Sequence, residues 1–170
     1  MNKVSLFAII TAFLSAPYAH AADGTINFTG TITETACSVN ISTQSVDLGT
    51  VSASALTGLG TTAAPTRFTI SLITCPIAVS TAKVRFDGTT AVGNSSILKL
   101  NVGETATNVG VAIYEDDSST LIPVGSPSAA KTLVSTGTND LTYIAKYMAT
   151  GTPVSAGSAN ATATFTITYS

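Results

Sequence analysis

The sequence predicts an all-β fold, a sandwich or barrel assembled from many short strands. Apolar residues alternate with polar ones along most of the chain, and no window of about eleven residues shows the helical period of 3.6 residues. Clusters of Gly, Pro, Ser and Asp separate the alternating segments, as turns do. Charged residues make up only 9 % of the 170 residues, and hydroxyl residues, 30 Thr and 19 Ser, replace much of the missing charge. Threonine is β-branched and fits a pleated, half-buried surface, so the composition favours the same fold class.

The expected strands follow this alternation along the chain. Taken in order, they lie at 26–32, 46–51, 68–72, 84–86, 97–100, 109–114, 121–124, 141–148 and 161–169. The turn clusters between them lie at 58–65, 93–96, 115–119, 125–128 and 151–157. This spacing of short strands and turns is typical of a sandwich or barrel, and the sequence contains no internal repeat.

The first and last of these strands alternate most regularly. In the first, Ile26, Phe28, Gly30 and Ile32 share one face, and threonines and an asparagine occupy the other. In the last, the apolar residues at 165, 167 and 169 alternate with threonines up to the final serine. Ordinary edge strands of a closed sandwich would also give this pattern, so periodicity alone does not distinguish closed from incomplete sandwiches.

Residues 1–21 are predicted to be a signal peptide. Lys3 supplies the positive charge, residues 4–14 form an uncharged apolar run, and Ala19-His20-Ala21 provides the small-x-small cleavage pattern. The apolar run is shorter than the roughly 20 residues that span a bilayer. No later apolar stretch approaches that length, so we expect an exported product without membrane insertion of the mature chain.

The composition also excludes several chemistries. The only histidine, His20, lies in the predicted signal peptide, so Ser-His-Asp and Cys-His catalysis and a typical catalytic zinc site are not expected. No Lys/Arg cluster is present for nucleic acid. We therefore expect no catalytic residue, metal or cofactor. In an oxidising compartment Cys37 and Cys75 are expected to form a disulfide; free thiols or a metal pair are the alternatives.

One acidic run needs separate treatment. Glu115-Asp116-Asp117 lies between two expected strands and lacks the alternating ligand spacing of a calcium loop. We interpret it as a solvated hairpin turn rather than a cation site.

Motifs at both ends of the chain and several inside it resemble the type 1 fimbrial subunits assembled by the chaperone–usher pathway. The C-terminal motif of that family corresponds here to Gly157, Phe165, Ile167 and Tyr169, and the N-terminal extension to Ile26, Phe28, Gly30 and Ile32. Cys37 and Cys75 fall where the family has its single disulfide. Segments 46–49, 107–111 and 147–151 look like internal signatures of the major pilins. The resemblance covers essentially all of residues 22–170.

This resemblance implies an incomplete immunoglobulin-like β-sandwich that lacks its last strand. Residues 22–33 would be an extension that acts as a donor strand, and residues 34–170 would be the pilin domain. A neighbouring subunit or a chaperone would complete the sandwich. The implied partners are identical subunits in a head-to-tail polymer, a periplasmic pilus chaperone and an outer-membrane usher. The implied location is a fimbria on the cell surface, reached through the periplasm.

Other functions compete with that of a major rod subunit that supports adhesion. A minor adaptor or tip-associated fimbrial subunit would share the same motifs, and a secreted carbohydrate-binding β-sandwich would share the fold class. A secreted hydrolase would need paired carboxylates across a cleft, whereas the carboxylates here are scattered along the sequence.

Overall fold

A computed structural model of the chain describes residues 26–30 and 36–170. The chain divides into two units, Met1–Ile32 and Thr33–Ser170, and each is described by itself. The predicted signal peptide and Ile32 lie outside the described residues. In the first unit, residues 26–30 have no regular secondary structure and are exposed.

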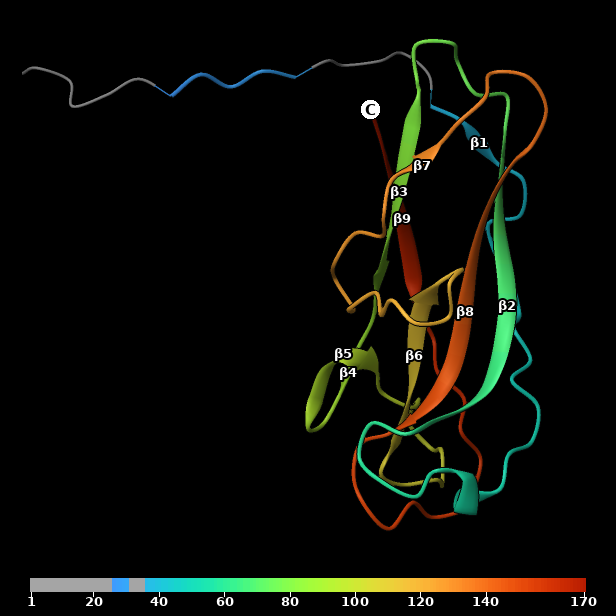
Figure 1. Cartoon of the computed structure of the whole chain (residues 1–170), viewed down its shortest axis with the longest axis vertical. Helices are drawn as coiled ribbons and strands as arrows, with labels where there is room; N and C mark the ends of the chain where they lie inside the picture. The colour runs from blue at the N-terminus through green and yellow to red at the C-terminus, as the bar shows by residue number, and fades with distance from the viewer. Residues whose placement is uncertain (1–25, 31–35) are drawn as a thin grey trace, which may run out of the picture. The chain divides into compact units, whose positions relative to one another are not determined.

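The second unit is built almost entirely of β-strands (Figure 1). The strands are β1 (Ser38–Val39), β2 (Thr62–Ile73), β3 (Thr81–Asp87), β4 (Thr90–Ala91), β5 (Asn94–Leu98), β6 (Val109–Glu115), β7 (Lys131–Thr132), β8 (Asn139–Ala149) and β9 (Thr164–Tyr169). One turn of 3₁₀ helix, η1 (Ala53–Ala55), begins at Ser52, whose side chain accepts a hydrogen bond from the backbone N–H of Ser54. None of the helices in the described part of the chain is long and apolar enough to cross a membrane.

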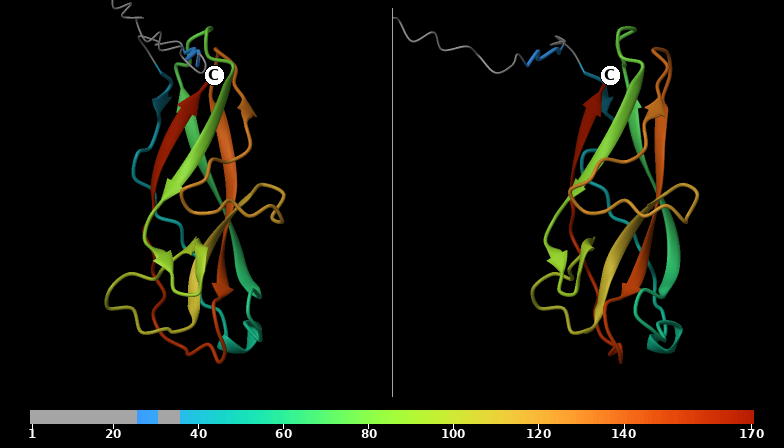
Figure 2. Two further views of the ribbon diagram at one scale, coloured as in Figure 1. Left: turned by 90° about the vertical axis from the view of Figure 1, so that its left-hand side faces the viewer. Right: turned by 60° about the vertical axis from the view of Figure 1, so that its left-hand side comes forward.

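The strands form two antiparallel sheets that pack face to face (Figure 2). The larger sheet has the order β1-β2-β8-β6-β5-β4, and the smaller has the order β7-β3-β9. Strands β2 and β8 pair from Thr62 opposite Met148 to Leu72 opposite Asn139, with a bulge near the start of β2. The predicted all-β fold is confirmed, as a sandwich.

The core lies between the sheets and follows from the alternation in the sequence. Leu72, Val84 and Tyr143 are fully buried, and each comes from a different strand. Three aromatic rings meet at the centre: Phe86 lies 5.2 Å from Tyr143 and 6.0 Å from Phe68, between ring centroids. Both contacts are edge-to-face, a geometry that aromatic quadrupoles favour.

A second, smaller apolar cluster lies on the outer face of the large sheet. It contains Ala91, Ile97, Ala112, Tyr114, Ile144 and Met148, with Leu121 packed against it. This cluster explains why every residue of β6 is buried, although a strand with one solvated face would alternate.

The structure differs from the sequence prediction in several segments. The turn predicted at 93–96 lies mostly in β5, which begins at Asn94, and residues 26–30 form no strand. Residues 46–51 alternate as expected but form no strand, because no strand lies beside them to pair with. Residues 121–124 form only an isolated bridge between Leu121 and Tyr114. The turn predicted at 58–65 is too long, because β2 begins at Thr62.

Candidate functional site

An open groove of about 1200 Å³ runs along one side of the sandwich. Segment 39–51 forms one wall, and segment 154–165, which leads into β9, forms the other. The floor is made by core side chains of both sheets: Phe68, Ile70, Phe86, Val111, Ile113 and Tyr147. The groove therefore exposes the apolar core where a closed sandwich would cover it.

The first rim of the groove is an unpaired backbone. Residues 41–51 make no backbone–backbone hydrogen bond to any other described residue. Their side chains nevertheless alternate: Val46 and Leu48 are half-buried against the core, whereas Asp47 is exposed. The Asp47 carboxylate accepts a hydrogen bond of 2.8 Å from the backbone N–H of Gly49. This rim has the side-chain pattern of a strand and lacks a partner.

The second rim is the free edge of β9. Ser170 and Thr81 exchange two backbone hydrogen bonds, 2.9 and 3.0 Å long, and β9 continues in the same register along β3. Hydrogen-bonded and non-hydrogen-bonded pairs alternate in an antiparallel ladder. The backbone groups of Phe165, Ile167 and Tyr169 therefore point away from β3, towards the groove.

The side chains of these three residues face the core but are only half-buried, whereas the threonines between them are exposed. Burial raises the pKa of the Tyr169 phenol. A further strand between the two rims would cover these side chains and pair with both backbones.

Gly157 lies in the groove wall just before β9, where only a glycine fits. A Cβ at this position would overlap the backbone of Thr105 and Ala106. The backbone N–H of Ala106 donates a hydrogen bond of 3.1 Å to the carbonyl of Ser158 beside it. This close approach packs the groove wall against the loop between β5 and β6. The packing within the domain therefore explains why position 157 is a glycine.

Cys37 and Cys75 form a disulfide, as predicted. It joins the start of the second unit to the loop after β2. The amide of Asn139 donates a hydrogen bond of 3.4 Å to the sulfur of Cys75, and the Tyr169 hydroxyl lies 3.5 Å from the carbonyl oxygen of Cys37. The disulfide thus lies at the same end of the domain as the C-terminus.

The groove is mainly apolar, with acidic groups near one tyrosine. The pKa of Tyr147 is raised by burial and by the nearby charges of Asp47 and Glu104. The pKa of Glu104 is lowered, chiefly by hydrogen bonds from Asn160 and Ser158. Of these three ionisable groups, Asp47 and Tyr147 line the groove, whereas Glu104 lies outside its lining.

Two of the predicted donor residues in the first unit are strongly exposed. Within residues 26–30, Phe28 is 92 % exposed and Ile26 is 78 % exposed. Gly30 has no neighbouring atom within 4 Å of the position of a Cβ. The predicted donor residues that are described are therefore uncovered in the single chain, and their insertion into a groove stays a prediction.

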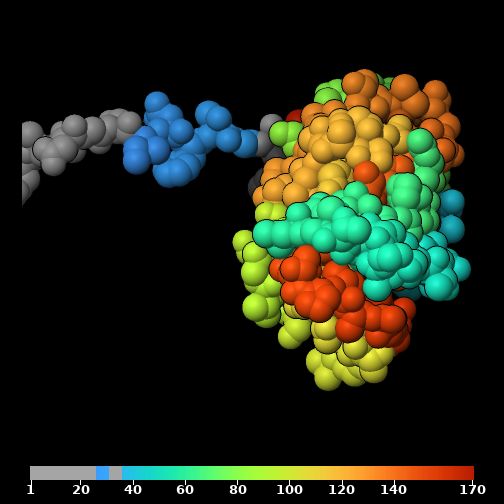
Figure 3. All heavy atoms as spheres, turned by 60° about the horizontal axis from the view of Figure 1, so that its bottom comes forward, coloured from blue at the N-terminus to red at the C-terminus, as the bar shows by residue number. Residues whose placement is uncertain are grey.

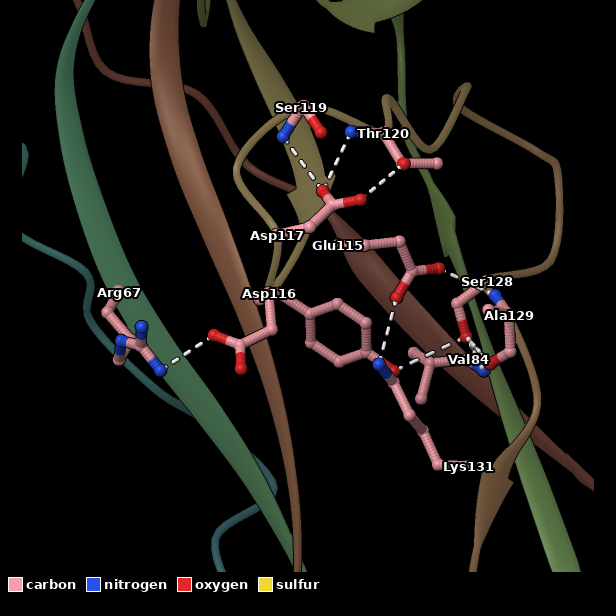
Figure 4. Close-up of polar contacts among 11 residues, drawn as sticks. Arg67, Val84, Glu115, Asp116, Asp117, Ser119, Thr120, Ser128, Ala129 and Lys131 are labelled. Atoms are coloured by element: carbon pink, nitrogen blue, oxygen red, sulfur yellow. Dashed lines mark hydrogen bonds and ion pairs between the residues drawn. The ribbon is translucent and has the colours of Figure 1, made fainter.

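The sequence analysis missed a set of polar contacts on the other side of the sandwich (Figure 4). Glu115 is buried, accepts a hydrogen bond of 2.6 Å from the backbone N–H of Ala129, and pairs with Lys131 at 3.2 Å. The Ser128 hydroxyl accepts a 3.0 Å hydrogen bond from the backbone N–H of Val84 and lies 3.3 Å from the Tyr143 hydroxyl. These contacts join the two sheets beside β7.

The interpretation of 115–117 as a solvated turn is therefore wrong for Glu115 and holds for its neighbours. Asp116 pairs with Arg67 at 2.6 Å, on an exposed surface. Asp117 accepts hydrogen bonds from the Thr120 hydroxyl and from the backbone N–H groups of Thr120 and Ser119, which close the turn and hold its pKa well below the usual range. The three carboxylates thus share no partner residue: Glu115 binds Ala129 and Lys131, Asp116 binds Arg67, and Asp117 binds Ser119 and Thr120 (Figure 4).

Comparisons with known proteins identify the family of this chain. A family model described as "Fimbrial protein" matches residues 26–170. The fimbrial subunit type 1 of Salmonella typhimurium is 37 % identical over 152 residues, which cover 86 % of this chain and 82 % of the relative.

Two solved structures show the same fold. The P pilus rod subunit PapA is 28 % identical with a TM-score of 0.67, over 80 % of this chain and 100 % of that one. A chain in the structure of a chaperone–usher pilus is 30 % identical with a TM-score of 0.66, over 91 % of this chain and 100 % of that one. The chain therefore belongs to the fimbrial protein family, as a type 1 fimbrial pilin: a structural subunit of surface chaperone–usher pili and not an enzyme.

Proposed function

We propose that this chain is a rod subunit that polymerises head to tail by donor-strand complementation. Segment 24–32 of one copy fills the groove of the next. The observation that carries the proposal is the groove itself, an exposed apolar floor between two unpaired backbone rims. An added strand pairs its backbone with such rims and places every second side chain on the floor.

The extension has the alternation that this role requires. Covering the side chains of Ile26, Phe28 and Ile32 contributes roughly 1.5–3 kcal/mol each, before the backbone ladder is counted. Gly30 suits a shallow part of the groove, where a side chain would clash. Because donor and acceptor surfaces differ, the contact does not close on itself and propagates as a fibre.

The assembly route follows from the exposed groove. An uncovered apolar edge promotes aggregation, so a free subunit needs a temporary partner. A periplasmic chaperone that lends a strand to the groove would supply it, and an outer-membrane usher would then exchange that strand for an extension. In this proposal residues 1–21 are removed on export, 22–33 form the extension, and 34–170 form the acceptor domain.

A rod position is favoured over a minor adaptor or tip position by the similarity to PapA, which is itself a rod subunit. A rod subunit is also the most abundant protein of its pilus. Quantification of this chain in sheared pili tests the assignment, and a content far below that of another subunit would place it in a minor position.

Removing the extension should separate folding from polymerisation. Deletion of residues 22–29 is expected to leave a subunit that is recovered in soluble complex with its chaperone but forms no pili. Phe28→Asp should act similarly, because an unpaired carboxylate in an apolar groove costs several kcal/mol. Asn27→Asp, on the opposite face, is the matched control and should assemble normally.

The measurement is pilus yield together with recovery of the soluble complex for each variant. Gly30→Leu adds a test of the shallow position, since it should slow assembly without reducing the complex. If the deletion removes the complex as well as the pili, the segment is an ordinary strand of its own domain and the proposal fails.

A further inference from the structure

The outer face of the small sheet is the part of the domain where positive charge collects. We call "threonine face" the outward side chains of β3 and β9: Lys83, Arg85, Asp87, Thr164, Thr166 and Thr168. Each of the three β3 residues lies directly opposite one of the threonines in the antiparallel ladder, so the six side chains share one face. Strands β3 and β9 lie side by side in both views of Figure 2. The apolar residues of both strands face the core instead.

The threonine face continues past the end of β3 to a further cation. Lys99 lines a hollow of about 320 Å³ there, together with Asp87 and Thr164. The backbone N–H of Lys99 donates a hydrogen bond of 2.8 Å to the carbonyl of Thr89, which holds Lys99 next to the turn that follows β3. Three of the seven Lys and Arg residues of the chain therefore lie on or beside this face.

The cations elsewhere on the domain already have partners. Arg67 and Lys131 each pair with a carboxylate, and the Lys146 ammonium donates to a backbone carbonyl and lies over a tyrosine ring. In contrast, Lys83 and Lys99 are exposed, and their ammonium groups have no hydrogen-bond or ion-pair partner among the described residues. These two groups are therefore available to an external anion.

Most of the negative charge of the domain lies away from this face. Of its six side chains only Asp87 is a carboxylate, and it binds the Nε of Arg85 at 3.0 Å. That pair leaves the other N–H donors of the guanidinium without a partner in the described part of the chain. The end of the domain that Figure 3 brings forward, where segments 57–61, 101–107 and 150–158 lie side by side, contains one carboxylate and no Lys or Arg. The threonine face is thus cationic in a chain whose net charge is −2.

The groups on this face match a ligand that carries both hydroxyls and fixed negative charges. Successive outward residues of a strand lie about 7 Å apart, so cations and hydroxyls are spread regularly over the face. A sulfate group has several terminal oxygens, and one group can accept from the Lys83 ammonium and from the Thr168 hydroxyl opposite it. The six side chains include no aromatic ring on which a nucleic-acid base could stack, and no apolar group that could enter a membrane.

We propose that the threonine face, together with Lys99, binds a sulfated polysaccharide. Sulfate groups pair with the three cations, and sugar hydroxyls exchange hydrogen bonds with the threonines. Exposed ion pairs are individually weak, so a single subunit binds such a polysaccharide weakly. A pilus repeats the same face in every subunit, and a polysaccharide that contacts several subunits gains avidity. This adds a ligand-binding face to the assembly role proposed above and does not involve the groove.

Binding of dextran sulfate to purified pili tests the proposal, with neutral dextran of the same length as the control ligand. Dextran sulfate should bind, neutral dextran should not, and high salt should weaken the binding. Lys83→Gln with Lys99→Gln should lower the affinity about tenfold, because these variants remove two of the three cations. Arg67→Gln with Lys146→Gln is the matched control on the large sheet. It changes the net charge equally and should leave the affinity within about twofold.

Electron microscopy checks that each variant forms pili. Where a variant assembles poorly, mature chain immobilised densely on a surface provides the same repeated display. An equal loss of affinity in both variant pairs would show that binding follows net charge and would overturn the assigned face, as would an unchanged affinity in Lys83→Gln with Lys99→Gln. A DNA duplex that competes as well as dextran sulfate at equal charge would overturn the choice of a polysaccharide. Binding to the isolated mature chain but not to pili would also overturn the proposal, because the face would then be covered in the polymer.

Discussion

The small sheet has two edge strands, β7 and β9, and only one of them is joined to the large sheet. On one side of β3, strand β7 is joined to the large sheet through Glu115, Lys131 and Ser128. On the other side, β9 leaves its outer backbone unpaired opposite residues 41–51. The closed edge is completed by residues of the chain itself, whereas the open edge has two rims of suitable pattern and no strand between them.

The two rims of the groove have the side-chain pattern of strands although their backbones are unpaired among the described residues. Val46 and Leu48 on one rim, and Phe165 and Ile167 on the other, already turn towards the core. They remain half-buried because no other residue of the described ranges covers them. In the proposed function, a strand from another chain would complete this edge, as the polar contacts of Glu115, Lys131 and Ser128 complete the closed edge.

The largest expected effect compares two phenylalanines that face each other across the ladder. Phe86 of β3 is paired with Phe165 of β9, but Phe86 is buried and Phe165 is half-buried. Phe86→Ala should lower the free energy of unfolding by about 3–5 kcal/mol, because it leaves a cavity between packed rings. Phe165→Ala should cost about 1–2 kcal/mol in the free chain, since its ring is still partly in water.

Denaturant unfolding of the mature chain in dilute solution measures the loss of stability in Phe86→Ala and in Phe165→Ala. Each variant is measured with and without a peptide of residues 22–33. The peptide should enlarge the cost of Phe165→Ala and leave that of Phe86→Ala unchanged. If the peptide changes neither cost, β9 does not border the occupied groove.

The sequence predicts features that depend on local alternation better than contacts between residues far apart in the chain. The alternating side chains of both rims are visible in the sequence as a period of two, in Val46 and Leu48 and in the last strand. The sequence also predicts a strand at 46–51, which is wrong, because pairing depends on a neighbour that the local pattern does not contain. The disulfide was predicted from two cysteines and an oxidising compartment. The closed edge was not, because the burial of Glu115 depends on Lys131 and Ala129, which only the fold brings beside it. No local pattern distinguishes that glutamate from its exposed neighbours.

A smaller effect is expected from the charges of the closed edge. Lys131→Met removes the partner of the buried Glu115 carboxylate and should lower the free energy of unfolding by about 2 kcal/mol, below the range for fully buried pairs because Lys131 is a third exposed. Asp116→Asn breaks the exposed pair with Arg67 in the same turn and should cost about 0–1 kcal/mol. If both variants lower the free energy of unfolding equally, the buried Glu115–Lys131 pair does not stabilise the closed edge more than an exposed pair does.

The smallest effect on stability is expected at alkaline pH. There the pKa of Tyr143, whose hydroxyl lies near Ser128 at the closed edge, is compared with that of Tyr169 at the open edge. Burial raises the pKa of Tyr143 to about 12, whereas an unfolded tyrosine titrates near about 10. Folding thus favours the neutral phenol, so this contribution to stability is complete below about pH 10 and is lost as the pH rises towards 12. Tyr143→Phe should flatten the loss of stability in that window.

At the open edge the pKa of Tyr169 is also raised by burial, but its ring is still half-buried. A peptide in the groove would remove more water from the ring, so the Tyr169 pKa should rise further while that of Tyr143 stays unchanged. Tyrosinate absorbance during titration reports both, and Tyr143→Phe and Tyr169→Phe assign the transitions against those of Tyr114 and Tyr147, whose pKa values burial also raises. A peptide-dependent shift that persists in Tyr169→Phe and disappears in Tyr143→Phe would place the inserted strand away from β9. A shift confined to Tyr169 would show that only the open edge changes its exposure to water when the sandwich is completed.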